Sequence, residues 1–442
     1  MEPPLSKFAL LITGFLLTLS WWQASSAEDL LTVYRLALAN DAELMIAESN
    51  YLAAIQALPL AQSGNRPQVF FNADGRITES DNSNTGTNSS DNIGYGVNLT
   101  QSLYNTVTAG DINIAEANTR AELARLKAAR QSLMLRVSQT YFSILAAGDN
   151  AEFAYAERNA IARQLEEAQK RFEVGLIAIT DVHEAQASFD SAEAQVILAE
   201  NILENSFQSL IVLTADTSIR NLAPLGDDLK LVLPNPATIQ AWVTLALNNN
   251  LDLRAAQESL NAARYDRDKN YRNRNPTVDL FASYQGRDSN DDLLGDSQQD
   301  DLTVGIELQI PLYKGGRISA ERVQAASRMA AAQNTTLLQT RLAAQQSRTA
   351  FLDVVSGISQ VKALEQAFES SKIALEATQA GFEVGTRTSV DVLISLRETY
   401  RTQRDYASAR YQYVLNKLRL KQAAGILQEE DLNDANNSLV KQ

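Results

Sequence analysis

The chain has 442 residues, no cysteine, a single histidine and a formal net charge of -14. The lack of cysteine excludes disulfides, thiolate nucleophiles and cysteine-ligated zinc. The acidic balance argues against a nucleic-acid partner, because phosphate binding requires clustered Lys and Arg. The sequence also has no Gly-rich phosphate loop and no nucleophile elbow, so it predicts neither an enzyme nor a cofactor or metal site.

Residues 1–27 have the pattern of a cleaved signal peptide. An uncharged run at 8–22 follows Lys7, and small residues ending at Ala27 come before the acidic residue Glu28. The run is shorter than the ~20 apolar residues that a membrane helix requires. The mature chain is therefore expected to begin at Glu28, with an uncleaved anchor as the alternative. No other segment is expected to cross a membrane as a helix.

The two halves of the chain resemble each other. Residues 36–41 (Leu-Ala-Leu-Ala-Asn-Asp) are echoed by 245–250 (Leu-Ala-Leu-Asn-Asn-Asn) at an offset of 209, which is 245 minus 36. Residues 172–175 (Phe-Glu-Val-Gly) recur at 382–385, at an offset of 210. Units of this length are far larger than a solenoid repeat of ~20 to 50 residues. The chain is therefore interpreted as a duplicated half-protein.

The two structural repeats, 28–225 and 226–442, are predicted to share one order of elements. Each begins with a helix, at 29–63 or 239–270, followed by two alternating strands and two long helices that meet at a glycine turn. The expected β-hairpins span 68–104 and 277–313, the helical hairpins span 108–215 and 317–425, and a short C-terminal tail follows.

The predicted strands alternate apolar and polar residues, as in Val97-Asn98-Leu99-Thr100. The segments 79–92 and 286–301, rich in Ser, Asn, Asp and Gly, are expected to be long surface loops. Four strands of ~10 residues have the length of membrane strands, but the smallest membrane barrels have ~8 strands. Either they form a soluble sheet under the helices, or several chains share one barrel. Alternation together with a signal peptide favours the shared barrel.

Two segments, 108–174 and 317–384, are rich in Ala, Leu, Gln, Glu and Arg and contain no proline. A helix of this length approaches ~100 Å, which no single globular core accommodates. Such rods indicate a coiled-coil-like bundle or barrel. A secreted coiled-coil filament is the alternative, although a filament has no need of strand pairs with a lipid-facing side.

Two strings at the glycine turns carry a family resemblance. Residues 171–182 (Arg-Phe-Glu-Val-Gly-Leu-Ile-Ala-Ile-Thr-Asp-Val) and 381–393 (Gly-Phe-Glu-Val-Gly-Thr-Arg-Thr-Ser-Val-Asp-Val-Leu) resemble the two periplasmic turns of the TolC family. The resemblance extends from Asp29 to about Asp431. It implies a mixed α+β membrane protein, a homotrimer in which four strands per chain form a twelve-stranded transmembrane β-barrel. That barrel would continue into a long periplasmic α-helical barrel.

The resemblance also implies a function. The chain would be a passive, gated exit duct in the outer membrane of a Gram-negative cell, extending into the periplasm and serving tripartite efflux pumps and type I protein secretion. Its implied partners are a periplasmic adaptor of the membrane fusion kind, an inner-membrane transporter of the RND, ABC or MFS class, and outer-membrane lipid.

The same resemblance assigns a periplasmic gate to the turns. Asp391 would line the narrowest ring, and Arg387 would reach Thr180 and Asp181 on the neighbouring hairpin to hold the helices in. The alternative is that Asp181 and Asp391 only stabilise the first turns of their helices, with Thr180 or Ser389 as caps.

The chain departs from the family at Ile394, where a second acidic ring is expected, and at Phe382, where a tyrosine is expected. Exposed turn residues are also candidates for adaptor contact, and packing between helices is the alternative for the apolar ones. These candidates are Gly175, Leu176, Ile177, Gly385 and Thr386.

Overall fold

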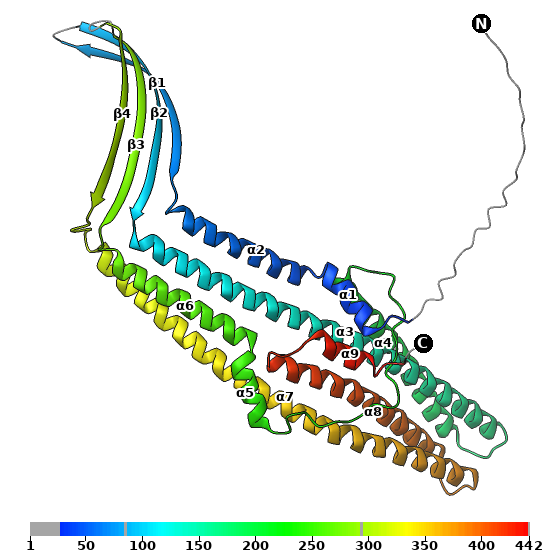
Figure 1. Ribbon diagram of the computed structural model, residues 1–442. Helices are drawn as coiled ribbons and strands as arrows, with labels where there is room; N and C mark the ends of the chain where they lie inside the picture. The colour runs from blue at the N-terminus through cyan, green and yellow to red at the C-terminus, as the bar shows by residue number, and fades with distance from the viewer. Residues whose placement is uncertain (1–26, 84–85, 292–294, 441–442) are drawn as a thin grey trace, which may run out of the picture.

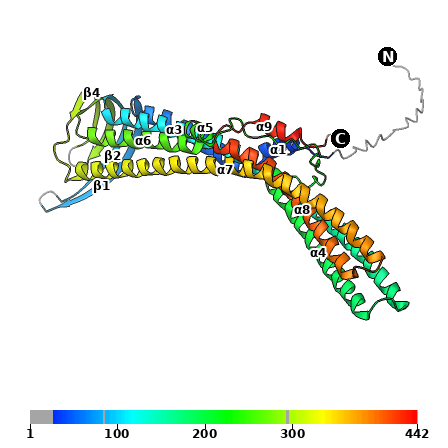
Figure 2. The same cartoon turned by 90° about the horizontal axis from the view of Figure 1, so that it is seen from below.

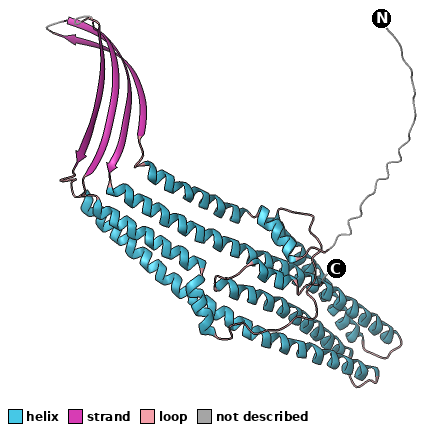
Figure 3. Ribbon diagram, viewed as in Figure 1, coloured by secondary structure: helices cyan, strands magenta, loops and turns pink. Residues whose placement is uncertain are grey.

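The structure is a computed structural model that describes residues 27–83, 86–291 and 295–440. It is elongated, with all four strands at one end and long helices running away from them (Figure 1 and Figure 3). The predicted signal peptide, 1–27, lies outside the described residues except for Ala27.

Each repeat begins with two helices rather than the single helix expected. The break falls at Asp41 in the first repeat and at Asn250 in the second, where the side chain of each caps the next helix. Asp41 accepts the N–H of Leu44 at 2.8 Å and Asn250 accepts the N–H of Leu253 at 3.0 Å. The helices are α1 (Leu30–Asn40), α2 (Ala42–Ser63), α5 (Ile239–Asn249) and α6 (Leu251–Arg272).

The strands form one antiparallel sheet in the order β1-β2-β3-β4. Asp81 pairs with Thr87 and Ser289 pairs with Ser297, so both hairpins continue far into the segments expected to be loops. The expectation of long loops at 79–92 and 286–301 is therefore wrong, because backbone pairing continues through their polar residues. The bounds are β1 (Gln68–Asn82), β2 (Gly86–Tyr104), β3 (Thr277–Asp291) and β4 (Ser297–Gln309).

The last strand is shorter than expected. β4 ends at Gln309 rather than at Tyr313. Pro311 follows two residues later and cannot donate a ladder hydrogen bond. Gly315 and Gly316 then adopt positive φ angles of 57° and 83°, which lead the chain into the next helix.

Two long helical hairpins lie below the sheet. They are formed by α3 (Thr106–Glu173) with α4 (Ile179–Thr214), and by α7 (Arg317–Glu383) with α8 (Ser389–Ala423). The side chain of Asn105 caps α3, accepting the N–H of Val107 at 2.9 Å. Figure 2 shows that the lower parts of the two hairpins bend together, away from the direction of the upper helices.

Helix α4 is long and apolar enough to cross a membrane by length and composition, so the expectation that no segment after the signal peptide meets this test is wrong. Only 22% of its most apolar window is buried, and Ile197, Leu198 and Ile202 are exposed. One such helix is weak evidence for a membrane span. Here α4 runs alongside α3 as one arm of a hairpin (Figure 1).

The main hydrophobic core lies midway along the molecule, where α1, α3, α8 and α9 (Glu429–Asn436) meet. Tyr34, Tyr141, Phe142, Tyr413 and Leu432 are almost completely buried there. Burying one such side chain contributes about 1.5–3 kcal/mol. A second, smaller cluster lies at the far end of the hairpins, and we call it the tip cluster: Ala160, Ile161, Leu165, Ala168, Ala185, Ala192, Leu393 and Leu396.

Candidate functional site

The two turns at the ends of the long hairpins are built in the same way. Gly175, with a φ of 73°, donates to the carbonyl of Phe172, and the next N–H, of Leu176, donates to the carbonyl of Arg171, both at 2.9 Å. This pair of bonds is a Schellman motif, which requires a left-handed residue after the helix. The first turn therefore needs glycine at position 175.

The second turn repeats this geometry. Gly385, with a φ of 79°, donates to the carbonyl of Phe382 at 3.1 Å, and Thr386 donates to the carbonyl of Gly381 at 2.8 Å. The equivalence that the sequence repeat predicted between Gly175 and Gly385 thus extends to individual hydrogen bonds. Both turns end a long helix and start its return within a few residues.

The two returning helices begin differently. Asp391 and Thr388 form a capping box at the start of α8: the Asp391 carboxylate accepts the N–H of Thr388 at 2.9 Å, and the Thr388 hydroxyl accepts the N–H of Asp391 at 3.2 Å. Helix α4 begins after Ala178 with no side-chain cap. The expected caps, Thr180 and Ser389, are therefore wrong, because Ser389 is already the first residue of α8 and Thr180 the second residue of α4.

The electrostatics of Asp391 follow from this capping. Hydrogen bonds from the backbone and side chain of Thr388, together with the nearby positive charge of Arg387, hold the pKa of the Asp391 carboxyl below its usual value. Asp391 thus carries a negative charge at neutral pH. The capping role that the sequence left open for Asp391 is present in the structure.

Arg387 is exposed and lies across the end of α7. Its backbone N–H donates to the carbonyl of Gly381 at 3.2 Å, and a Cβ atom added to Gly381 would lie 2.8 Å from the Arg387 Cγ. Within the described residues of one chain, no ion pair joins Arg387 to Asp181. The hydroxyl of Thr180 lies 3.5 Å from the Asp181 carboxylate at the start of α4.

The apolar turn residues divide into two groups. Leu176 is 71% exposed and Val384 is 76% exposed, whereas Ile177 is half-buried against the tip cluster. Ile177 therefore packs between helices, which was the alternative reading for that residue. Leu176 and Val384 therefore contribute to the exposed apolar surface at the tips, together with Val174, which is 70% exposed.

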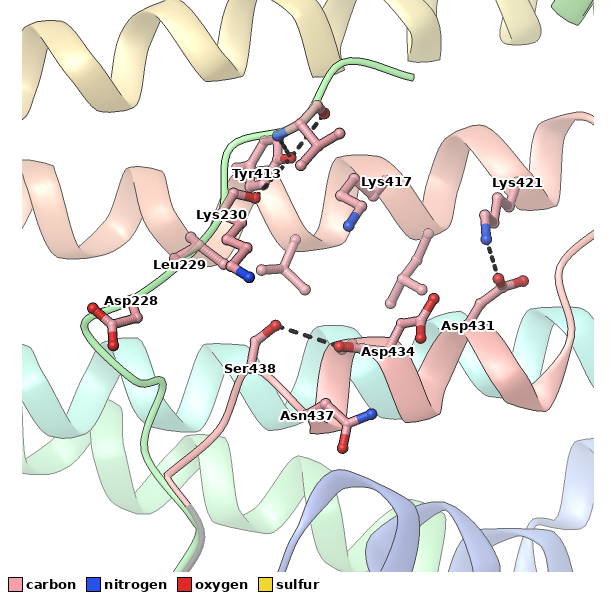
Figure 4. Close-up of a pocket in the computed structure, with 14 residues that line it drawn as sticks. Asp228, Leu229, Lys230, Tyr413, Lys417, Lys421, Asp431, Asp434, Asn437 and Ser438 are labelled. Carbon is pink, nitrogen blue, oxygen red and sulfur yellow. Dashed lines mark hydrogen bonds and ion pairs between the residues drawn. The ribbon is translucent and has the colours of Figure 1, made fainter. Parts of the chain in front are cut away.

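A pocket of about 290 Å³ lies near the middle of the molecule between α8, α9 and the linker around residues 228–232 (Figure 4). Lys421 pairs with Asp431 across it, and the Tyr413 hydroxyl accepts the N–H of Val232 at 2.8 Å. Burial and the neighbouring Lys421 lower the pKa of the Lys417 ammonium. This pocket could not be predicted from the sequence, because the linker and α9 have no counterparts in the repeat pattern.

Sequence reasoning also missed one contact and one residue at the tips. The Arg171 guanidinium lies over the ring of Phe382, 4.3 Å from its centroid, and thereby joins the two hairpins. Thr388 was not singled out, although the Thr-x-x-Asp spacing of 388–391 is a readable capping signal. The ring contact has no such local signal, because its partners are 211 residues apart, which is 382 minus 171. No group of His, Asp and Glu suited to a metal ion occurs among the residues described.

The molecule has strands of membrane length with an exposed apolar sheet face at one end, and long helical hairpins with matched turns at the other end. These features define a class of protein, an elongated channel subunit. Comparison with known proteins agrees with this class. The profile of the outer membrane efflux protein family matches residues 33–216 and 242–426, one match in each repeat. The chain belongs to this family.

Individual relatives extend this result. The chain is 37% identical to outer membrane protein TolC of Vibrio cholerae over 433 residues, which cover 97% of this chain and 98% of the relative. It is 28% identical to the alkaline protease secretion protein AprF of Pseudomonas aeruginosa, over 96% of this chain and 89% of that protein. The Campylobacter jejuni CmeC outer membrane channel shares the fold with a TM-score of 0.79 at 18% identity, covering 100% of this chain and 98% of that structure.

The chain is therefore a TolC-family outer-membrane channel of efflux and type I secretion, located in the outer membrane and extending into the periplasm. The alternative of a secreted filament is not supported, because the chain matches outer-membrane channels along almost its whole length and theirs. The family is one of channels, and TolC-like channels work with periplasmic adaptors and inner-membrane transporters.

Proposed function

We propose that three copies of the chain form one duct, in which twelve strands close a transmembrane β-barrel and the long helices form a periplasmic barrel. The observation that carries this proposal is the open four-stranded sheet, whose outer strands β1 and β4 each pair on one side only. In lipid, every unpaired backbone group costs several kcal/mol. Four strands are too few to close a barrel, so several chains are needed, and the family resemblance supplies the number three.

The side chains of the sheet support a lipid-facing surface. Leu302, Val304 and Ile306 alternate along β4 and are 74%, 65% and 68% exposed in the single chain. Phe71 and Ile77, two of the exposed apolar residues of β1, are 71% and 79% exposed. Apolar residues at every second position of a strand are the pattern of a barrel wall in lipid.

The mass of the purified protein in detergent tests this assembly. Light scattering coupled to size exclusion, corrected for detergent, should give three times the mass of one mature chain. A Val304→Arg variant places a charge on the lipid-facing side and should lose the assembly, whereas Thr303→Arg, on the opposite face, should keep it. A monomeric wild type would contradict the shared barrel.

We further propose that Arg387 of one chain pairs with Asp181 and Thr180 of the neighbouring chain, and that the Asp391 carboxylates form the narrowest ring. Arg387 is an exposed cation with no ion pair inside its own chain, among the residues described. An exposed ion pair contributes about 0.2–1 kcal/mol. A few such pairs hold a tunnel shut and still allow a docking partner to break them together.

Engineered cysteines test the gate directly, because the natural chain has none. The double variant Arg387→Cys with Asp181→Cys should form disulfides between chains, visible as covalent dimers and trimers on a non-reducing gel. A matched pair, Arg254→Cys with Asp181→Cys, serves as the control, because Arg254 lies on α6 far from the tips. Disulfides confined to single chains, or none at all, would exclude the contact between chains.

For partners, we propose that the exposed turns receive a periplasmic adaptor of the membrane fusion kind. The candidate contacts are Gly175, Leu176, Gly385 and Thr386, of which Leu176 presents the most exposed apolar side chain. Ile177 packs against the tip cluster, so only the exposed part of its side chain could add to this contact. An inner-membrane transporter of the RND, ABC or MFS class would supply the energy, and the duct itself would be passive and without enzymatic activity. The name of the Pseudomonas aeruginosa relative supports protein secretion as one use.

The division into repeats at 28–225 and 226–442 also remains a proposal. It is supported by the identical order of two short helices, two strands and two long helices in each half. Each half would then contribute one β-hairpin and one helical hairpin to a common ring.

A further inference from the structure

The pocket of about 290 Å³ in the middle of the molecule has one basic and one acidic wall (Figure 4). Tyr413, Lys417 and Lys421 line it from α8 at spacings of four residues, which places them on one face of that helix. Asp431 and Asp434 line it from α9 at a spacing of three residues, again on one face. The two helices therefore present lysines and aspartates to the same cavity.

The two walls form an ion pair at one end of the pocket only. There the Lys421 ammonium pairs with the Asp431 carboxylate, whose side chain is 10% exposed. Lys417 lies one turn earlier on α8, and its ammonium has no hydrogen bond or ion pair among the residues that the structure describes. The same holds, within those residues, for the Asp434 carboxylate. Figure 4 shows both groups pointing into the space between α8 and α9.

The positive charge of Lys417 is poorly compensated in this arrangement. Burial and the like charge of Lys421 lower the pKa of the Lys417 ammonium, and the attraction of Asp434 and Asp431 offsets only part of this effect. The ammonium also lies 5.8 Å from the centre of the Tyr413 ring. A carboxylate bound against Lys417 would therefore stabilise its charged form, and a cation bound against Asp434 would complete the opposite wall.

The size of the pocket and its remaining lining limit what could bind there. The volume is close to the lower limit of about 300 Å³ for small-molecule sites, so a molecule with few carbon atoms would fill it. Asp228 and Lys230 of the linker add one charge of each sign. The other lining residues include five with short apolar side chains, which are Leu229, Val232, Val414, Leu418 and Ala435.

We propose that this pocket binds a free aliphatic α-amino acid. Its carboxylate contacts Lys417, its ammonium contacts Asp434, and its side chain packs against the apolar lining. A free amino acid has both charges on a single carbon atom, whereas a residue within a peptide or at either end of one lacks at least one of them. The bound molecule bridges α8 to α9 beside the Lys421–Asp431 ion pair. The site lies in the middle of the molecule and does not depend on the proposed gate at the tips.

Titration calorimetry of the purified protein in detergent tests this site, with L-leucine as the probe. We expect saturable binding of one molecule per chain. Two analogues keep the aliphatic chain of leucine and each lack one charge: 4-methylpentanoate has no ammonium, and 3-methylbutylamine has no carboxylate. Each should bind about ten- to a hundred-fold more weakly than leucine, because a hydrogen bond between charged groups is lost.

Two variants remove the same charges from the protein. Lys417→Met and Asp434→Asn approximately keep the lengths of the side chains, and each should weaken leucine binding by a similar factor. Arg419→Gln on α8 and Glu430→Gln on α9 are the matched controls, because neither residue lines the pocket. Both controls should bind leucine as the wild type does.

The possible results are distinct. A wild type that binds no leucine up to its solubility limit would overturn the proposal. Binding of 4-methylpentanoate as tight as that of leucine would indicate a plain anion site, and equally tight binding of 3-methylbutylamine a plain cation site; either result rejects the amino acid. Leucine binding that is unchanged in both Lys417→Met and Asp434→Asn would place the ligand elsewhere. If a variant fails to fold, the analogue series still decides, because it uses only the wild type.

Discussion

At the scale of single residues, a short motif at the tips of the helical hairpins predicts the local backbone structure better than the composition does. The string Phe-Glu-Val-Gly, present twice, contains the glycine that a Schellman motif requires and the aromatic residue before it. Both glycines could be assigned to turns from the sequence. Arg387 and Asp391 could be placed at the tip, and the Thr-x-x-Asp spacing of 388–391 is a local signal for the capping contact of Asp391. The packing of the Arg387 stem against Gly381 has no comparable local signal.

Replacing Gly385 by alanine should lower the free energy of unfolding of the tip by about 1 kcal/mol, because φ at this position is 79° and an L side chain is strained there. Gly148 provides the matched control: it lies inside α3 with nothing within 4 Å of an added Cβ. Gly148→Ala should be neutral or stabilise by up to ~1 kcal/mol. Guanidinium unfolding of both variants measures the difference, and equal effects would refute the argument.

The capping box predicts a specific response to acid. The pKa of Asp391 lies below its usual 3.8 in the folded chain, so its ionised form stabilises the first turn of α8 above that value. This stabilisation is lost as pH falls through the folded pKa. Hydrogen exchange of the first turn of α8, measured against pH, should report a midpoint below 3.8.

Thr388→Val is the informative variant for this titration, because it removes the hydroxyl that donates to the Asp391 carboxylate at 3.0 Å. The midpoint should then move upward, toward the usual value for an aspartate. Ser395→Ala, one helical turn further along α8, should leave it unchanged. A midpoint that is the same in wild type and Thr388→Val would remove the capping box as the cause.

At the scale of elements, the pattern of apolar residues predicted whether a segment is a helix or a strand, but it did not predict where a helix is interrupted. The helix before each β-hairpin was predicted to be continuous. It breaks at Asp41 or Asn250, because the side chain of that residue accepts a hydrogen bond from the backbone N–H three residues later. The polar ends of the β-hairpins read as loops, because serine and asparagine are common in turns. They are strands because the partner strand continues beside them, which is a non-local cause.

The break at Asp41 should be important for stability. The Asp41 side chain is only 4% exposed, and it accepts hydrogen bonds from Arg136 at 2.8 and 3.0 Å in addition to capping α2. Asp41→Ala removes a cap and a partly buried ion pair and should lower the free energy of unfolding by about 2–4 kcal/mol.

The neighbouring carboxylate is the control for that experiment. Glu43 also pairs with Arg136, at 3.1 Å, but its side chain is 62% exposed. Glu43→Ala should therefore change the free energy of unfolding by no more than about 1 kcal/mol. Chemical unfolding of the two variants under identical conditions measures the contrast, and similar losses would contradict the role given to Asp41.

At the scale of the whole molecule, the sequence repeat predicted the order of elements. The packing in the middle of the molecule could not be predicted from it and is known only from the structure. The linker after α4 and helix α9 meet around α8 and close the main core, with Leu225 bridged to Leu439 and Leu432 fully buried. Neither segment has a counterpart in the other half. Their packing joins the end of the first repeat to the end of the second.

The shape of the single chain is consistent with the proposed assembly of several copies. The sheet at one end is open and exposes apolar residues, and at the other end Arg387 has no ion pair among the residues that the structure describes. Neighbouring copies of the chain would satisfy both features. The same assembly that closes the barrel would bring each Arg387 toward an adjacent α4. Under the proposed assembly, closure of the barrel and closure of the gate would both follow from one arrangement of the chains.

The most direct test of a gated duct is the single-channel conductance of the purified mature protein in planar bilayers, compared with Arg387→Ser and with Arg254→Ser as a control distant from the tips. We expect a small wild-type conductance that rises in Arg387→Ser and stays unchanged in Arg254→Ser. A large wild-type conductance that is the same in all three proteins would contradict the gate, and the absence of any conductance would contradict the duct itself.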